Sequence, residues 1–276
     1  MDMREQARDW TGDWRNVDQA ADPAAMLKFL DLARSRSDIQ AARQRGFELL
    51  SLEIGNQILD VGCGTGEETQ ALSTLVGPSG RAIGVDYSEA MVMTAQERSH
   101  GSGLPIEFHQ GDVLGLEFED GSFDGTRAER LLMHLENPGL AMAEIVRVTK
   151  ANGRVVITEP DLGTYAISGG DRVVTRKLLE NMCDNRSNGW IGRMLPGLFK
   201  SCGLLDIGIE PWTTTNISYD KVNESGILSR GLGKAVEDGA ISATEAARWD
   251  DDMKLAEDAG VFFYAVTYFT VYGRKA

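Results

Sequence analysis

Three alternating glycines follow an apolar run in ILDVGCGTGEE, from Ile58 to Glu68. A tight turn between a buried strand and a helix selects glycine, because glycine adopts positive φ angles without steric cost. The dinucleotide pattern G-x-G-x-x-G places its third glycine three residues after the second. Here Gly62, Gly64 and Gly66 alternate, and Glu67 stands in that third place. The turn therefore indicates a nucleotide-type cofactor without deciding which one.

Two carboxylates end the next two predicted strands. Asp86 lies about twenty residues beyond the glycine turn, where a carboxylate can accept hydrogen bonds from both hydroxyls of a ribose. Asp112 ends the third strand, in HQGDVLGLEF, where an acidic side chain can accept from the exocyclic amino group of adenine. A nicotinamide dinucleotide has no particular need for the second carboxylate. The pair favours an adenosine cofactor of another kind.

Short apolar strands alternate with helical stretches to position these groups. The strands are expected at 57–62, 80–86, 105–112, 122–129 and 152–160, and the helices at 67–76, 88–99 and 138–150. Such alternation predicts a parallel sheet with helices on both faces. Right-handed crossovers bring the carboxyl ends of the strands, and any ligand, to one edge of that sheet.

The alternation changes after Glu159. Strand-like segments recur at 204–212 and 261–274, and two largely helical insertions are expected at about 161–194 and 213–260. In the second insertion, Ser242 and Glu245 form a capping box. We expect a single domain over 1–276, with an N-terminal helical cap (1–52), a cofactor-binding core (53–160), late strands with helical lid insertions (161–260) and a final strand (261–276).

The amino-acid composition favours some classes of binding partner over others. The 42 acidic and 28 basic residues give a net charge of −14, which repels a phosphate backbone and disfavours a nucleic-acid substrate. The densest basic stretch, from Arg34 to Arg45, has the spacing of a solvated helix face. Three scattered cysteines predict a reducing compartment, with neither a disulfide framework nor a zinc site. With no apolar signal core and no apolar run of ~18 residues, we expect a cytoplasmic protein without membrane insertion.

Four segments together carry a family resemblance. LDVGCGTGEE, VDYSEAMVMTAQER, QGDVLGLEFEDGSFDGTRAERLLMHLENP and EIVRVTKANGRVVITEPD resemble the class I S-adenosylmethionine-dependent methyltransferases. They are most similar to the small-molecule group that includes the ubiquinone and menaquinone biosynthesis methyltransferases. The resemblance covers about 58–161 and weakens toward both ends. It implies a doubly wound, mostly parallel seven-stranded α/β sheet, S-adenosylmethionine as cofactor, and a small-molecule substrate.

The resemblance also implies a cofactor site. The amino group of the cofactor would be held by Asp60 through water, and its ribose by Asp86. Turn glycines let the backbone approach the methionine part. The full implied set is Asp60, Gly62, Gly64, Gly66, Asp86, Tyr87, Met91, Gly111, Asp112, Val113 and Arg127. The alternatives are that Asp60 caps the turn, that Met91 belongs to the core, and that Asp112 forms a turn.

Methyl transfer from a sulfonium is an in-line displacement, so orientation and exclusion of water do most of the work. A general base helps only where the nucleophile has a proton to lose. The candidates are Glu129, His134, Glu159 and Asp161. His134 is the catalytic candidate because imidazole titrates near neutral pH, although MHLENP is also typical of a structural helical turn.

Charged and aromatic residues elsewhere suggest further contacts. In RAER (127–130), the charges either form an internal ion-pair network or contact the cofactor carboxylate or the substrate. Trp190 and Arg193 suit a flat or anionic small molecule, and Tyr165 is a further candidate for substrate binding. The alternative for Trp190 is a core anchor. Additional aromatic candidates are Trp10, Trp14, Trp212 and Tyr219.

Other functions compete with small-molecule methylation. A protein that binds S-adenosylmethionine without transferring its methyl group remains the alternative, because no base is assured. An NAD-dependent oxidoreductase is disfavoured by the glycine spacing and by Asp112. A nucleic-acid methyltransferase is disfavoured by net charge and because GTRAER stands where N-P-P-Y-type enzymes carry their motif. Neither the substrate nor the methylated atom follows from these patterns.

Overall fold

A computed structural model describes residue 18, residues 37–224 and residues 226–276. Contacts divide the chain into two compact units. Unit 1 comprises 1–159, 194–210 and 270–276, and unit 2 comprises 160–193 and 211–269. Most of the expected N-terminal cap, with Trp10 and Trp14, lies outside the described residues. Its described helix is α3, Ser37–Leu50.

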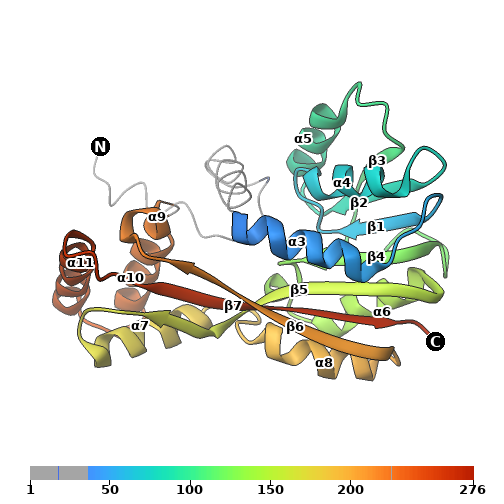
Figure 1. The fold of residues 1–276 in the computed structure, drawn as a ribbon. Coiled ribbons are helices and arrows are strands. Elements are labelled where there is room, and N and C mark those ends of the chain that lie inside the picture. Colours follow the sequence, from blue (N-terminus) through green and yellow to red (C-terminus); the bar gives the residue numbers. More distant parts are fainter. Residues whose placement is uncertain (1–17, 19–36, 225) are drawn as a thin grey trace. The chain divides into compact units, whose positions relative to one another are not determined.

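Seven strands form one sheet in the order β3-β2-β1-β4-β5-β7-β6 (Figure 1). They are β1 Gln57–Val61, β2 Arg81–Asp86, β3 Ile106–Gln110, β4 Phe123–Glu129, β5 Thr149–Ile167, β6 Leu205–Asn216 and β7 Tyr264–Arg274. Parallel pairing joins β1 to β2 and β4, β2 to β3, and β4 to β5. This confirms the doubly wound, mostly parallel fold. The strand order reverses between β1 and β4, and ligands of such sheets bind outside the carboxyl ends at that point.

The expected helices of the core form close to their predicted bounds. In chain order, the described helices after α3 are α4 Glu67–Val76, α5 Glu89–Ser99, the 3-10 helix η2 Leu132–His134, α6 Pro138–Val148, α7 Arg172–Asp184, α8 Ile191–Ser201, α9 Tyr219–Asn223, α10 Ile227–Glu237 and α11 Ala243–Asp258. The Ser88 hydroxyl caps α5 by accepting from the N–H of Met91. The predicted capping box at the start of α11 is present.

Two late strands are longer than expected. β5 continues to Ile167 where a helical insertion was expected from 161, and β6 continues to Asn216. Thr213–Thr215 are β-branched, and such side chains pack well on a pleated strand. Helix α7 begins only at Arg172, where the Asp171 carboxylate accepts from two backbone N–H groups. The helical insertions are therefore shorter than the pattern suggested.

Apolar side chains from β1 and its neighbours form the core of unit 1. Ile58 and Leu59 are fully buried, and Ile58 packs with Leu50 of α3 and Leu72 of α4. This burial fixes the position of β1 and, with it, the start of the turn that follows β1. Among the described residues, no helix combines the length and apolar character needed to cross a bilayer.

Candidate cofactor site

Each glycine of the turn between β1 and α4 adopts a backbone conformation that favours glycine. Gly62, Gly64 and Gly66 have φ angles of 72°, 54° and 83°, all in the left-handed region that other residues rarely adopt. A Cβ at Gly66 would also lie 2.5 Å from the Phe108 ring. Glu67 begins α4 directly afterwards. The turn is thus fixed by conformation and by packing.

Asp86, at the end of β2, holds this turn. Its Oδ2 accepts from the N–H of Gly64 at 2.8 Å, and its Oδ1 accepts from the N–H of Ser88 at 3.0 Å. Burial raises the pKa of Asp86, and these backbone hydrogen bonds act against that rise. Carboxylate oxygens each accept more than one hydrogen bond. The same side chain can therefore support the turn and receive ribose hydroxyls.

The other implied adenosine contacts lie on the segments that follow β2 and β3. Tyr87 is exposed at 57%, whereas Met91 and Val113 are buried. The N–H of Gly111 donates to the carbonyl of Asp86, which ties the end of β3 to the end of β2. The exposed Asp112 accepts from the N–H of Leu114. The sheet thus brings the predicted ribose and adenine carboxylates to the same edge.

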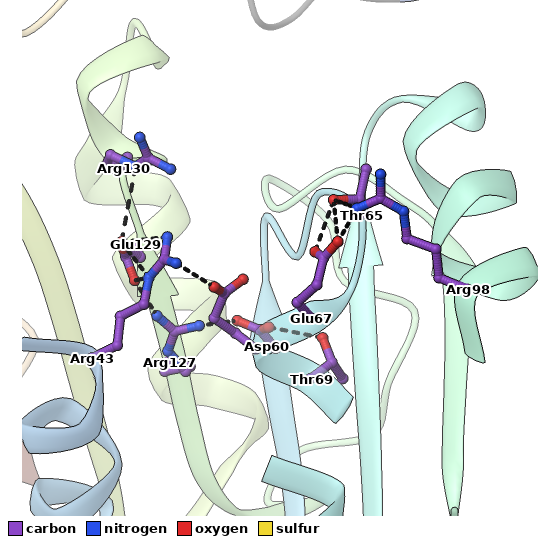
Figure 2. A network of polar contacts seen from close by, with 10 residues as sticks. Arg43, Asp60, Thr65, Glu67, Thr69, Arg98, Arg127, Glu129 and Arg130 are labelled. Carbon is purple, nitrogen blue, oxygen red and sulfur yellow. Dashed lines mark hydrogen bonds and ion pairs between the residues drawn. The ribbon is translucent and has the colours of Figure 1, made fainter. Parts of the chain in front are cut away.

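Asp60 lies inside an ion-pair network (Figure 2). Its Oδ1 accepts from Arg127 Nη1 at 2.9 Å, and its Oδ2 accepts from the Thr69 hydroxyl at 2.8 Å. Arg127 also donates to Glu129 Oε2 at 2.7 Å. Burial lowers the pKa of Arg127, but the carboxylates around it raise this pKa by more than burial lowers it. The guanidinium therefore stays charged. Two residues of RAER therefore form internal ion pairs.

Arg43 of α3 also joins this network, which the sequence pattern did not predict. Its Nη1 lies 2.7 Å from Glu68 Oε1, and its Nη2 lies 3.2 Å from Glu129 Oε1. The side chain is only 10% exposed, so Arg43 is no part of the solvated face expected for 34–45. Burial raises the pKa of Glu129, but Arg43 and Arg127 outweigh it and lower this pKa to about 2. The i,i+4 pattern of a helix carries no signal for such long-range pairs.

Glu159 lies within β5, near the end of the strand that the sequence predicted, and is fully buried. Its Oε1 accepts from the N–H groups of Leu131 and Leu132 at 2.8 and 2.6 Å, which caps η2. In the described part of the chain, Oε2 has no hydrogen-bond partner. Burial raises the pKa of Glu159 to about 8, because the backbone donors and Arg130 only partly offset it. At neutral pH this group is therefore a carboxylic acid.

We expect Glu159→Gln to gain stability relative to the parent chain as the pH rises from 5 to 8. An unfolded glutamate loses its proton near pH ~4.3, while the folded one keeps it until about pH 8. In that window the unfolded state binds fewer protons, so the parent chain loses up to ~1.4 kcal/mol per pH unit. Glutamine cannot ionise, and its amide oxygen can still accept from both N–H groups.

Urea unfolding of both proteins at pH 5, 6, 7 and 8 measures this difference. The matched control is Glu117→Gln, since Glu117 is exposed. A difference between Glu159→Gln and the parent chain that stays constant with pH would contradict the buried, protonated state of Glu159.

The remaining base candidates lie in different surroundings. His134 ends η2 and is half-buried, and its backbone N–H donates to the carbonyl of Leu131. Glu129 is engaged by arginines, as described above. Asp161 belongs to unit 2 and is fully buried. Of the four candidates, Glu129 ends β4 and His134 follows it in η2, whereas Glu159 lies within β5; all three belong to unit 1.

In unit 2, Asp161 binds Arg193 in a bidentate manner, with 2.5 Å from Oδ2 to Nε and 2.7 Å from Oδ1 to Nη2. The guanidinium carbon lies 4.7 Å from the centre of the Trp190 ring. A Cβ at Gly163 would meet Arg193 Nη2 at 2.6 Å, so the glycine makes room for this stack. Trp190 is 54% exposed, which speaks against a core anchor. Tyr165 packs against Tyr264, with ring centres 5.8 Å apart.

Comparison with known proteins adds an independent finding. A family profile described as methyltransferase domain matches residues 52–259. The chain is 34% identical over 247 residues to an uncharacterised 37.1 kDa protein in transposon Tn4556 of Streptomyces fradiae, covering 89% of this chain and 70% of that protein. It is 36% identical over 127 residues to the demethylmenaquinone methyltransferase of Lactobacillus johnsonii, covering 45% of this chain and 52% of that enzyme. The second match therefore spans about half of the relative's length.

Solved structures agree at the level of the fold. The YcgJ protein of Bacillus subtilis matches with a TM-score of 0.62 and 18% identity, covering 86% of this chain and 98% of that one. The phosphoethanolamine N-methyltransferase 2 of Haemonchus contortus, solved in complex with S-adenosyl-L-methionine, matches with a TM-score of 0.52 and 20% identity, covering 84% and 53%. With the family profile spanning most of the sequence, the chain belongs to the methyltransferase domain family, as a class I S-adenosylmethionine-dependent methyltransferase.

Proposed function

We propose that this enzyme methylates a small-molecule metabolite, a natural product or a quinone-like compound. The observation that carries the proposal is the glycine turn held by Asp86 at the carboxyl edge of the sheet. The likeness to demethylmenaquinone methyltransferases supports a quinone-like acceptor. The net charge of −14 speaks against a nucleic-acid substrate.

The residues present fit an adenosine cofactor that carries an amino acid end. Every glycine of the turn takes a left-handed backbone, and the place of a third dinucleotide glycine is filled by Glu67. The carboxylates of Asp86 and Asp112 suit a ribose and an adenine amino group. When bound, the cofactor supplies an activated methyl group. We assign its ribose to Asp86, its adenine to Gly111, Asp112 and Val113, and its methionine end to the turn.

The chain's own contribution to the reaction is orientation and exclusion of water. Glu159 of β5 accepts from the N–H groups of Leu131 and Leu132, and these hydrogen bonds hold the segment 130–134. If the acceptor carries a proton, we assign its removal to the imidazole of His134 in that segment. Asp60 supports Arg127 and Thr69 directly, so we assign it to the electrostatics of the turn in addition to the proposed water-mediated contact.

We propose that Trp190, Arg193 and Tyr165 of unit 2 contact the acceptor. Trp190→Ala should raise KM for the acceptor about tenfold, since one lost aromatic contact is worth ~1–2 kcal/mol, while the Kd for S-adenosylhomocysteine stays unchanged. Trp190 is a cleaner test than Arg193, because removal of Arg193 leaves the buried Asp161 carboxylate without its partner. Equal losses of cofactor affinity and melting temperature in Trp190→Ala would mark the ring as structural.

Release of S-adenosylhomocysteine, followed by mass spectrometry, tests the proposed function. Purified chain and S-adenosylmethionine are incubated with a fractionated small-molecule extract, and separately with tRNA and DNA. We expect release that depends on a small-molecule fraction. Tight cofactor binding without release in any fraction would favour the alternative, a protein that binds S-adenosylmethionine without methylating. Release with nucleic acid alone would contradict the substrate class.

A further inference from the structure

Among the residues that the structure describes, Arg130 at the carboxyl edge has no close ion pair. Asp60, Glu68 and Glu129 make their close contacts, at 2.7 to 3.2 Å, with Arg43 and Arg127. Arg130 reaches Glu129 only at 3.9 Å, although its side chain is no more than 22% exposed. Figure 2 shows its guanidinium standing apart from those of Arg43 and Arg127. A cation held in a partly buried place without a tight partner is available to an anionic ligand.

The backbone holds Arg130 in a conformation that its residue type does not favour. Its φ angle is 53°, in the left-handed region, which costs a non-glycine residue free energy. Its N–H donates to the carbonyl of Thr158 at 2.9 Å. The next two N–H groups donate to Glu159. Strain that neighbours enforce in this way is typical of functional positions.

This strained residue borders the glycine turn. In the pairing of β1 with β4, Val61 lies opposite Ala128, so the residues after β4 run beside the turn that follows β1. The side chain of Leu131 confirms this proximity, because a Cβ at Gly62 would lie 3.1 Å from its Cδ1. Arg130 therefore stands at the part of the turn to which the proposed function assigns the methionine end of the cofactor.

We propose that Arg130 binds the α-carboxylate of the cofactor's methionine end. A guanidinium matches a carboxylate in charge and in the geometry of its donors. The inference rests on the proposed function, since it requires the cofactor at this turn. It divides the three charged residues of RAER by task, with Arg127 and Glu129 inside the ion-pair network and Arg130 assigned to the ligand.

Two probes that differ in the carboxylate test the inference on the full chain by calorimetry. S-adenosylhomocysteine carries the α-carboxylate, and 5′-methylthioadenosine has the same adenosine thioether without the amino acid end. For Arg130→Gly we expect a 10- to 100-fold weaker Kd for S-adenosylhomocysteine, which is the effect of one lost charged hydrogen-bond pair, and an unchanged Kd for 5′-methylthioadenosine. Glycine adopts the observed φ freely, so the melting temperature should not fall.

The control is Arg81→Gln, which removes the same charge from an exposed ion pair with Glu107 at the amino end of β2. In this variant the Kd values for both probes should stay as in the parent chain. An unchanged Kd for S-adenosylhomocysteine in Arg130→Gly overturns the inference, and an anionic acceptor then becomes the occupant to examine. Equal losses for both probes overturn it too, since they show a general distortion of the turn. If the parent chain binds neither probe, the proposed function fails first.

Discussion

Arg127→Met is expected to lower the free energy of unfolding by about 3–5 kcal/mol, because it leaves the buried carboxylate of Asp60 without its arginine partner, whereas Glu129 keeps Arg43. The Arg127 side chain is 7% exposed and donates to both Asp60 and Glu129. Methionine fills a similar volume but supplies neither charge nor hydrogen-bond donors. Removal of one member of a buried ion pair costs more than the pair itself contributes, because the remaining charge stays desolvated.

Urea unfolding at pH 7 measures this loss. Arg81→Met is the matched control, since the Arg81–Glu107 pair lies on the surface with both side chains 45% exposed. Exposed pairs contribute only ~0–1 kcal/mol. Similar small losses in the two variants would contradict the view that the ion-pair network at the ends of β1 and β4 is buried.

Asp86→Ala is expected to weaken S-adenosylmethionine binding at least about 10-fold. The change removes one or two hydrogen bonds from the ribose to a charged acceptor, each worth ~1.5–3 kcal/mol. It also removes the acceptor of the Gly64 N–H, so the turn loses its support from β2. Both effects act on the cofactor end of the sheet.

A control for the lost support of the turn lies at the opposite edge of the same sheet, where the strands have their amino ends. Asp124, in β4, likewise accepts from a backbone N–H, that of Gln57, at 2.8 Å. Asp124→Ala should lower stability and leave the calorimetric Kd for S-adenosylmethionine unchanged. If Asp86→Ala binds as tightly as the parent chain, the ribose assignment is wrong.

Sequence patterns predicted the parts of the fold that local rules govern. The alternation of strands and helices, together with the glycine turn after β1, predicted the parallel sheet. It also predicted at which edge of the sheet Asp86 lies. Turn conformation depends on residues adjacent in the chain, as the left-handed angles of Gly62, Gly64 and Gly66 show. Helix caps such as Ser88 and Ser242 are local for the same reason.

Side-chain contacts between residues that are distant in the sequence could not be predicted from local patterns. Arg43 joins the network through partners on α4 and β4, and its helix carries no pattern that sets it apart from Arg45, which is half-exposed. The chemical state of Glu159 depends on burial by segments distant in sequence. The extension of β5 to Ile167 depends on pairing within the sheet, which overrides a weak local preference for helix.

The most direct test of the account is a crystal structure of the chain with S-adenosylhomocysteine. We predict that the ribose hydroxyls hydrogen-bond to the carboxylate of Asp86, that the adenine amino group lies at Asp112, and that the methionine end lies along Gly62 and Gly64. An adenosine bound away from the ends of β1 and β2, with Asp86 contacting only protein atoms, would contradict the placement of the cofactor in this enzyme.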